Sequence, residues 1–181
     1  MFNINPFITK EISEVSSKNL ENSSITKAFE NTKNFEQSKP EKIVLNTRNK
    51  DLDGDCHSET GTPFVKKTIM FEGNRYEGVF PKFDAIFETR LPRDIYQSSD
   101  AVQFKHCVNQ LRKKIESDPQ FSKQFSNRQL EQIKDGSPNI SGLTWHHTEN
   151  PGKMQLVNSD IHAKCGHTGG RSIWGGGSDA R

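Results

Sequence analysis

The sequence predicts an α+β fold, in which a helical scaffold carries an N-terminal β-hairpin and a C-terminal ββα motif. Three observations predict it. Two segments rich in β-branched and aromatic residues flank the turn pair Gly73-Asn74. Apolar residues recur at helical spacing between residues 100 and 133. Residues 142–170 combine two strand-like segments, a turn and a short helical segment, and they contain four of the six histidines of the chain.

The first expected element is a β-hairpin over residues 67–80, because strand-like segments lie on both sides of Gly73-Asn74. The apolar residues that follow have the spacing of a helix that a proline would end: Phe83, Phe87, Leu91 and then Pro92. These side chains are expected to belong to the core.

Three helices are expected next. The longest covers residues 100–117 and has an apolar stripe of Phe104, Cys107, Val108, Leu111 and Ile115. A second helix starts at Asp118-Pro119, because proline suits the first position of a helix. Ser126 and Gln129 have the spacing of a capping box, which predicts a third helix. These helices would form the scaffold on which the C-terminal motif lies.

The C-terminal motif is expected to be a strand, a turn, a second strand and a short helix. Residues 143–146 and 154–157 have strand composition, and Pro151-Gly152 between them favours a turn. The next residues suit the N-cap of a helix, and a glycine follows where that helix would end: Asn158, Ser159, Asp160 and Gly166.

The histidines of this motif would meet in such an arrangement. Imidazole is the commonest metal ligand in proteins. One histidine of the pair His146-His147 would bind a divalent ion together with His162 and His167, leaving an open coordination position as catalytic sites do. The other would take a proton from water, and a metal beside a base is what phosphodiester hydrolysis requires. Cys165 is the alternative to His167 as a ligand.

The pattern Trp-His-His, then Met-Gln-Leu-Val, then His-x4-His-x-Gly-Gly resembles the Trp-His-His branch of the HNH/endonuclease VII nuclease superfamily. The adjacent histidines are also similar to those of the nuclease colicins. The resemblance implies a ββα-metal finger at residues 142–170, in the C-terminal toxin domain of a bacterial polymorphic toxin. It implies that His146, His162 and His167 bind the metal, and that His147 is the general base.

Two positions depart from the pattern of that family. The asparagine that braces the loop between the two strands in HNH proteins would fall at Lys153. Many members of the branch carry a third consecutive histidine, and this chain has Thr148 there. The brace is therefore missing or replaced by another residue.

Composition excludes several classes of protein. Only 30% of the residues are hydrophobic, so part of the chain is expected to be unpacked. No apolar run is long enough to span a membrane, and the N-terminus lacks the form of a signal peptide. A secreted effector of this sequence would need a dedicated secretion system or a carrier. The three cysteines include no CxxC pair, which argues against a disulfide framework.

The chain is expected to divide near residue 60. Residues 1–60 are rich in Ser, Asn, Lys, Glu and Thr and predict a polar, partly disordered linker or recruitment segment, with faint helical patterns at residues 8–20 and 25–35. Residues 61–181 are expected to form the nuclease toxin domain. The sequence His-Ser-Glu-Thr-Gly-Thr-Pro-Phe that begins at His57 resembles a junction found upstream of polymorphic-toxin domains.

Charge gives weak support for nucleic-acid binding. The net charge is +2; residues 1–60 carry 8 basic and 10 acidic side chains, and residues 61–181 carry 17 and 13. A nuclease that cuts without sequence preference needs contacts to phosphates. The candidates for these contacts are Arg112, Lys113, Lys114, Lys153 and Arg171.

The sequence thus predicts a metal-dependent endonuclease that hydrolyses phosphodiester bonds of DNA with one divalent ion, Zn²⁺, Ni²⁺, Mg²⁺ or Mn²⁺. DNA is favoured over RNA by the resemblance alone. The resemblance also implies an antibacterial toxin that acts in the cytoplasm of a target cell, and a cognate immunity protein. Two alternatives are a non-catalytic nucleic-acid-binding module stabilised by zinc, and a degenerate domain that acts as an adaptor.

Overall fold

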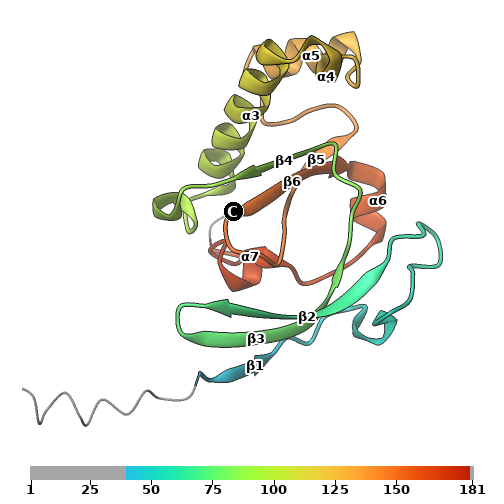
Figure 1. Cartoon of the computed structure of the whole chain (residues 1–181), viewed down its shortest axis with the longest axis vertical. Helices are drawn as coiled ribbons and strands as arrows, with labels where there is room; N and C mark the ends of the chain where they lie inside the picture. The colour runs from blue at the N-terminus through green and yellow to red at the C-terminus, as the bar shows by residue number, and fades with distance from the viewer. Residues whose placement is uncertain (1–39, 180–181) are drawn as a thin grey trace, which may run out of the picture. The chain divides into compact units, whose positions relative to one another are not determined.

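The computed structural model describes residues 40–179, which form two three-stranded sheets and several helices (Figure 1). The first sheet has the order β1-β3-β2, with β1 (Lys42–Val44), β2 (Phe64–Phe71) and β3 (Asn74–Pro81). The second has the order β4-β6-β5, with β4 (Phe87–Arg90), β5 (Leu143–His147) and β6 (Lys153–Asn158). The helices are η1 (Lys50–Leu52), η2 (Arg93–Ile95), α3 (Asp100–Ser117), α4 (Pro119–Ser122), α5 (Asn127–Lys134), α6 (Ser159–Lys164) and α7 (Gly170–Ile173). The predicted α+β class is confirmed, and the faint helical patterns at residues 8–20 and 25–35 lie outside the described residues.

The predicted β-hairpin forms from β2 and β3, which pair antiparallel from Phe64 opposite Pro81 to Phe71 opposite Asn74. Its turn is Glu72-Gly73, one residue earlier than predicted. Both turn residues have positive φ, 48° and 78°, as a two-residue type I′ turn requires. That backbone twist matches the twist of the two strands, so the turn fits without a bulge.

Residues 40–60, within the predicted polar segment, make long-range contacts with the rest of the described chain. β1 pairs parallel with β3. Asn49 Nδ2 donates to the carbonyl of Gly166 at 2.6 Å. Thr60 Oγ1 lies 3.0 Å from Cys165 Sγ. Residues 40–60 thus contact the loop that follows α6.

The helix predicted around Phe83, Phe87 and Leu91 is wrong. Phe87–Arg90 form β4, which pairs antiparallel with β6 and places Phe87 opposite Leu156. Residues four apart lie on one face of a helix, but they also lie on one face of a strand, so this spacing fits both structures. This segment forms a strand because the edge of β6 supplies hydrogen-bond partners for its backbone. Only the folded chain brings that edge close.

The three scaffold helices are confirmed. α3 covers residues 100–117 as predicted. Asp118 caps α4 by accepting from two backbone N–H groups, and Pro119 begins that helix. Ser126 and Gln129 form the capping box of α5. These local signals depend only on neighbours in sequence, which is why they locate the helix starts well.

Two clusters of buried side chains lie on the two faces of the second sheet. One joins that sheet to α3 and contains Cys107, Val108, Leu111, Trp145, Met154, Leu156 and Trp174. The other joins it to the first sheet and contains Phe64, Val79, Phe83, Val157 and Cys165. Successive side chains of β6 enter different clusters, because neighbouring residues of a strand point to opposite faces. The same alternation applies to β5.

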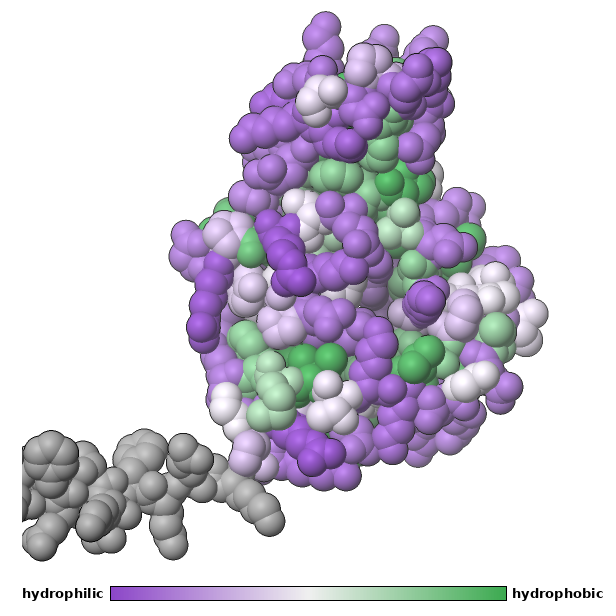
Figure 2. Space-filling view, viewed as in Figure 1, coloured by the Kyte–Doolittle hydropathy of each residue, from purple (hydrophilic) through white to green (hydrophobic). Residues whose placement is uncertain are grey.

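The face of the molecule shown in Figure 2 is mostly hydrophilic, with hydrophobic residues in separate patches. In the part of the chain that the structure describes, no helix has both the length and the apolar character to cross a membrane.

Candidate metal centre

β5 directs its two adjacent histidines to opposite faces of the sheet. His146 lies opposite Gln155 and its ring packs against Phe83, whereas His147 lies opposite Met154 and contacts Gln103 of α3. Both histidines are buried, with exposed fractions of 4% and 6%. Strand alternation therefore gives the two neighbours different surroundings.

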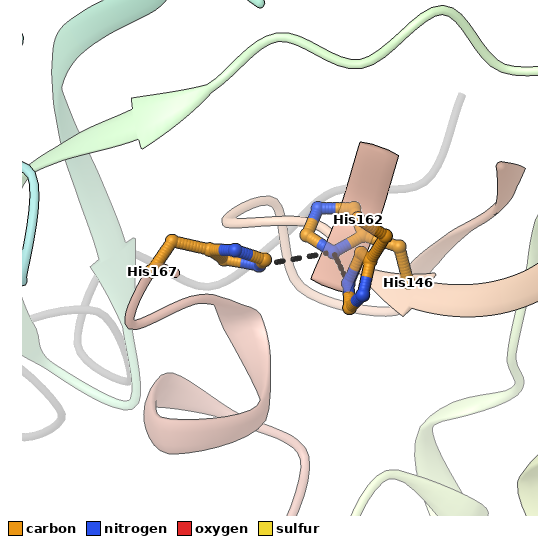
Figure 3. A group of neighbouring side chains, drawn as sticks. All are labelled: His146, His162 and His167. Carbon is orange, nitrogen blue, oxygen red and sulfur yellow. Dashed lines mark hydrogen bonds between the residues drawn. The ribbon is translucent and has the colours of Figure 1, made fainter. Parts of the chain in front are cut away.

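On its face, His146 meets His162 of α6 and His167 of the following segment (Figure 3). The Nδ1 of His146 lies 3.3 Å from the Nε2 of His162 and 3.3 Å from the Nε2 of His167. Metal–nitrogen bonds of about 2.0–2.1 Å at tetrahedral angles separate two ligand nitrogens by roughly 3.4 Å. The spacing fits three ligands of one ion, and we call these histidines the trio.

The trio offers three potential ligand atoms. Within residues 40–179, no fourth His, Cys, Asp or Glu side chain belongs to it, and its ligand atoms all lie within 4.8 Å of one another. Cys165, the alternative ligand, is fully buried and its Sγ contacts the Thr60 hydroxyl. His167 Nδ1 donates to the Cys165 carbonyl at 2.7 Å, which leaves the lone pair on Nε2. His167, just past the end of α6, therefore completes the trio.

Phe83 forms an apolar floor under the trio. Its ring centroid lies 4.9, 5.3 and 5.5 Å from the ring centroids of His146, His162 and His167. Only 6% of Phe83 is exposed, so it shields one side of the three imidazoles from water. Sequence reasoning missed this role, since the spacing of Phe83 indicated only a core residue.

Burial keeps the trio neutral. It lowers the pKa of His146 well below its usual value, and the neighbouring His167 and His162 lower it further. Burial, followed by the charge of His167, lowers the pKa of His162 to about 4, and burial also lowers the pKa of His167. A neutral imidazole keeps the lone pair that binds a metal ion. At neutral pH all three imidazoles can therefore offer a lone pair to an ion.

His147 has a different environment, built by the first turns of α3. Its Nε2 lies 2.5 Å from the Oε1 of Gln103. Burial lowers the pKa of His147 to about 4, with Asp100 opposing this shift and Arg171 adding to it. The ring is therefore neutral near pH 7, the form in which an imidazole accepts a proton.

The contributions of α3 to the site were missed from the sequence. Asp100, Gln103 and Phe104 are spaced i, i+3 and i+4, so one helix face carries all three. This spacing was the feature of the sequence that could have shown that α3 contributes to the site. Polar residues near the start of a helix are, however, usually interpreted as caps.

A cavity of about 450 Å³ connects the trio with His147. Arg171, one of the five basic residues predicted to bind nucleic acid, also lines it. The Arg171 guanidinium forms an ion pair with Asp100, and its Nε donates to the Gly177 carbonyl at 2.7 Å. Its Nη2 is buried and has no hydrogen-bond partner among the described residues. The cavity wall thus combines neutral imidazoles with the ion pair of Arg171 and Asp100.

The other four basic candidates do not line this cavity: Arg112, Lys113, Lys114 and Lys153. The three on α3 lie nine or more residues beyond Gln103, which is about 13 Å or more along the helix axis. Lys114 pairs with Asp118 at 2.9 Å, and Lys153 pairs with Glu88 at 2.8 Å.

Thr148 and Lys153, the two positions that depart from the HNH pattern, are hydrogen-bonded to each other. Thr148 Oγ1 donates to the Lys153 carbonyl at 3.0 Å, and the Thr148 backbone N–H donates to the same oxygen at 3.0 Å. The hydroxyl also accepts from the Asn150 N–H at 3.2 Å. Trp174 Nε1 donates to the Thr148 carbonyl at 2.9 Å. Thr148 thereby braces the loop between β5 and β6.

Gly170 lets α7 pack against this loop. A Cβ at Gly170 would lie 1.7 Å from the Thr148 carbonyl oxygen, so any side chain there would displace α7. The glycines after His167 therefore allow close backbone approach to the site.

A family model described as the DNase/tRNase domain of colicin-like bacteriocin matches residues 72–169, which is more than half of the chain. The matched region runs from the turn of the β-hairpin to just past the last histidine of the trio. Searches of curated proteins and of solved structures found no match.

Proposed function

Since the chain belongs to the family of DNase/tRNase domains of colicin-like bacteriocins, we propose that it is a metal-dependent HNH-type endonuclease of the Trp-His-His branch that hydrolyses phosphodiester bonds of DNA. One observation carries the proposal. Three neutral histidines with metal-ligand spacing and a fourth, separately held neutral histidine line the same cavity. A metal site beside an independent base is the arrangement that phosphodiester hydrolysis needs.

In this proposal, His146, His162 and His167 hold one divalent ion. The bound ion would supply positive charge for the scissile phosphate and the leaving oxygen. His147 takes a proton from the attacking water, whose oxygen bonds to phosphorus while the bond to the leaving oxygen breaks in line. The guanidinium of Arg171, which lines the cavity, supplies positive charge for a non-bridging phosphate oxygen.

The metal is proposed from the donor set. Three imidazoles suit Zn²⁺ or Ni²⁺ better than Mg²⁺ or Mn²⁺, which prefer oxygen ligands. A structural zinc site would instead be closed by a fourth protein ligand. The described residues supply three such ligands, which favours the catalytic reading over the zinc-stabilised binding module.

The biological role follows the family description. We propose an antibacterial effector that acts on nucleic acid in the cytoplasm of a target cell, after export by a carrier or secretion system. A free nuclease would also cleave the DNA of its producer, so a cognate immunity protein is part of the proposal. DNA is the first candidate substrate, and tRNA is the second because the matching family includes tRNase domains.

The function is tested by cleavage of plasmid DNA and of tRNA with Mg²⁺, Mn²⁺, Ni²⁺ or Zn²⁺, with EDTA as a control. His147→Ala is expected to lower the cleavage rate by roughly 10²–10⁴-fold while the protein remains folded and keeps its metal. His106→Ala, on α3 outside the cavity, is the matched control and should cleave normally. A folded, metal-loaded parent that cuts neither substrate would refute the proposal.

A further inference from the structure

We propose that Gln103 is a positioning residue that fixes the tautomer of His147, so that Nδ1 is the nitrogen that accepts the proton from water. This inference rests on the proposed function, because it assigns an atom to the general base. It concerns a neutral side chain of α3 that is fully buried, with an exposed fraction of 0%. Such a buried amide is costly unless its polar atoms are all used.

The orientation of the Gln103 amide is fixed by two backbone carbonyls. Its Nε2 donates to the Tyr96 carbonyl at 2.7 Å and to the Ser98 carbonyl at 2.8 Å. Carbonyl oxygens only accept, so both N–H bonds of the amide are used and the nitrogen must face them. The opposite orientation would place Oε1 against two oxygens. The Oε1 atom therefore faces His147.

This orientation determines which nitrogen of His147 carries the proton. Oε1 is an acceptor and lies 2.5 Å from the Nε2 of His147, so that nitrogen must be the donor. A neutral imidazole has one N–H, which leaves the lone pair on Nδ1. Among residues 40–179, no group forms a hydrogen bond with that Nδ1. The nitrogen free to accept a proton is thus defined by a chain of hydrogen bonds that ends in two backbone carbonyls.

The ring is also held in place by its neighbours. The Trp174 ring lies 5.2 Å from the His147 ring and the Phe104 ring lies 5.8 Å from it, centroid to centroid. Gln103 and Phe104 belong to one helix, and Trp174 ends α7. The hydrogen bond and the two aromatic contacts together restrict rotation of the imidazole, as a precise catalytic site requires.

A neutral acceptor suits both states of the base. Before the reaction, Gln103 Oε1 accepts from the Nε2–H of the neutral ring. After Nδ1 has taken the proton from water, Nε2 still carries its proton and the same bond persists. Gln103 therefore holds His147 through the proton transfer without competing for the proton.

The tautomer is tested directly by ¹⁵N NMR of the zinc-loaded protein with labelled histidines, which distinguishes a protonated from an unprotonated ring nitrogen. We expect His147 of the parent to carry its proton on Nε2. A proton on Nδ1 would overturn the proposal. This measurement does not depend on enzymatic activity, so it determines the tautomer even if the parent cleaves no substrate. The absence of cleavage would count against the proposed function and not against the tautomer.

The kinetic test compares Gln103→Met with Gln103→Glu. Gln103→Met loses the bonds to the Tyr96 and Ser98 carbonyls and the acceptor for His147 Nε2–H. The buried acid of Gln103→Glu, kept protonated by the two facing carbonyl oxygens, donates its O–H to one of them and still accepts from Nε2–H. We expect Gln103→Met to lower kcat by roughly 10–100-fold with KM and zinc affinity nearly unchanged, as loss of an orienting partner does. Gln103→Glu should retain most of kcat.

Gln110→Met, two turns further along α3, is the matched control and should have the kcat of the parent. Urea unfolding of each variant separates catalysis from stability. If Gln103→Met is folded and has normal kcat, or if both substitutions lower kcat equally, the residue is merely structural and the proposal fails.

Discussion

At the scale of single residues, the site depends on two histidines that are adjacent in sequence and point to opposite faces of the edge strand β5. His146 belongs to the cluster with Phe83, and His147 belongs to the side of α3. The sequence predicts the pair as functional, but adjacency alone does not divide the roles. The division follows from strand alternation once α3 and Phe83 lie on opposite faces of β5.

The histidine pKa values predict acid sensitivity of the metal-free protein. Burial holds the pKa of His147 and of His162 at about 4, compared with the usual 6.5. The unfolded chain therefore binds these protons first as pH falls. The stabilisation is complete above about pH 6.5 and is lost progressively down to about pH 4. For His147 alone, a pKa lowered from 6.5 to about 4 corresponds to a loss of roughly 3 kcal/mol in the free energy of unfolding over this range.

This expectation is checked by urea unfolding in EDTA at several pH values. The free energy of unfolding should fall between pH 6.5 and pH 4. Saturating Zn²⁺ should move the loss to lower pH, because the metal competes with protons for the same nitrogens. A free energy that stays constant across this window in EDTA would contradict the assignment.

Phe83 is expected to control metal affinity. Phe83→Leu keeps an apolar side chain but leaves space under the three imidazoles, so we expect zinc affinity to fall roughly tenfold. Calorimetric titration measures it. Phe121→Leu, on α4 and away from the trio, should lower stability without changing affinity. Equal affinities of the two variants would show that Phe83 only fills space.

At the scale of elements, the sequence predicts well where the signal is local. The starts of α4 and α5 follow from Asp118-Pro119 and from Ser126 with Gln129, because caps involve residues within one turn. β4 and β1 were not predicted as strands. Their partners, β6 and β3, are distant in sequence, and strand formation depends on such pairing more than on intrinsic preference.

The loop between β5 and β6 departs from the family pattern at Thr148, and the hydrogen bonds of Thr148 hold the loop in place. Thr148→Val keeps the shape of the side chain and removes the hydroxyl that bonds Lys153 and Asn150. We expect a loss of about 1–3 kcal/mol in unfolding free energy, with a lower kcat because His147 adjoins this loop. Thr148→Ser should restore both. Thermal unfolding and plasmid cleavage measure them, and a valine variant that matches the parent in both would exclude a bracing role.

At the scale of the whole molecule, we propose that the folded nuclease unit begins near Pro40 rather than near residue 61. A chain of residues 40–181 keeps β1, the Asn49 bond to Gly166 and the Thr60 contact with Cys165. A chain of residues 61–181 loses all three. We expect the longer fragment to match the melting temperature and zinc affinity of the full chain, and the shorter one to be lower in both. Equal behaviour of the two fragments would place the boundary at residue 61.

The site as a whole was predicted only where its residues cluster in sequence. The spacing of His162 and His167 after His146-His147 suffices to predict a metal site and a base. Gln103, Phe83 and Asp100 come from segments 44–84 residues earlier than the histidines they serve. No local pattern connects such positions, since tertiary packing alone brings them together.

The placement of the two tryptophans gives the molecule a built-in optical probe. Trp145 immediately precedes the histidine pair. The ring of Trp174, which is 1% exposed, lies 5.2 Å from the His147 ring, centroid to centroid. Since the chain has no other tryptophan, its tryptophan fluorescence originates at the cavity that the trio and His147 line. A quenching ion such as Ni²⁺ would dim that emission as it binds, so metal loading and loss are observable in real time in the unlabelled protein.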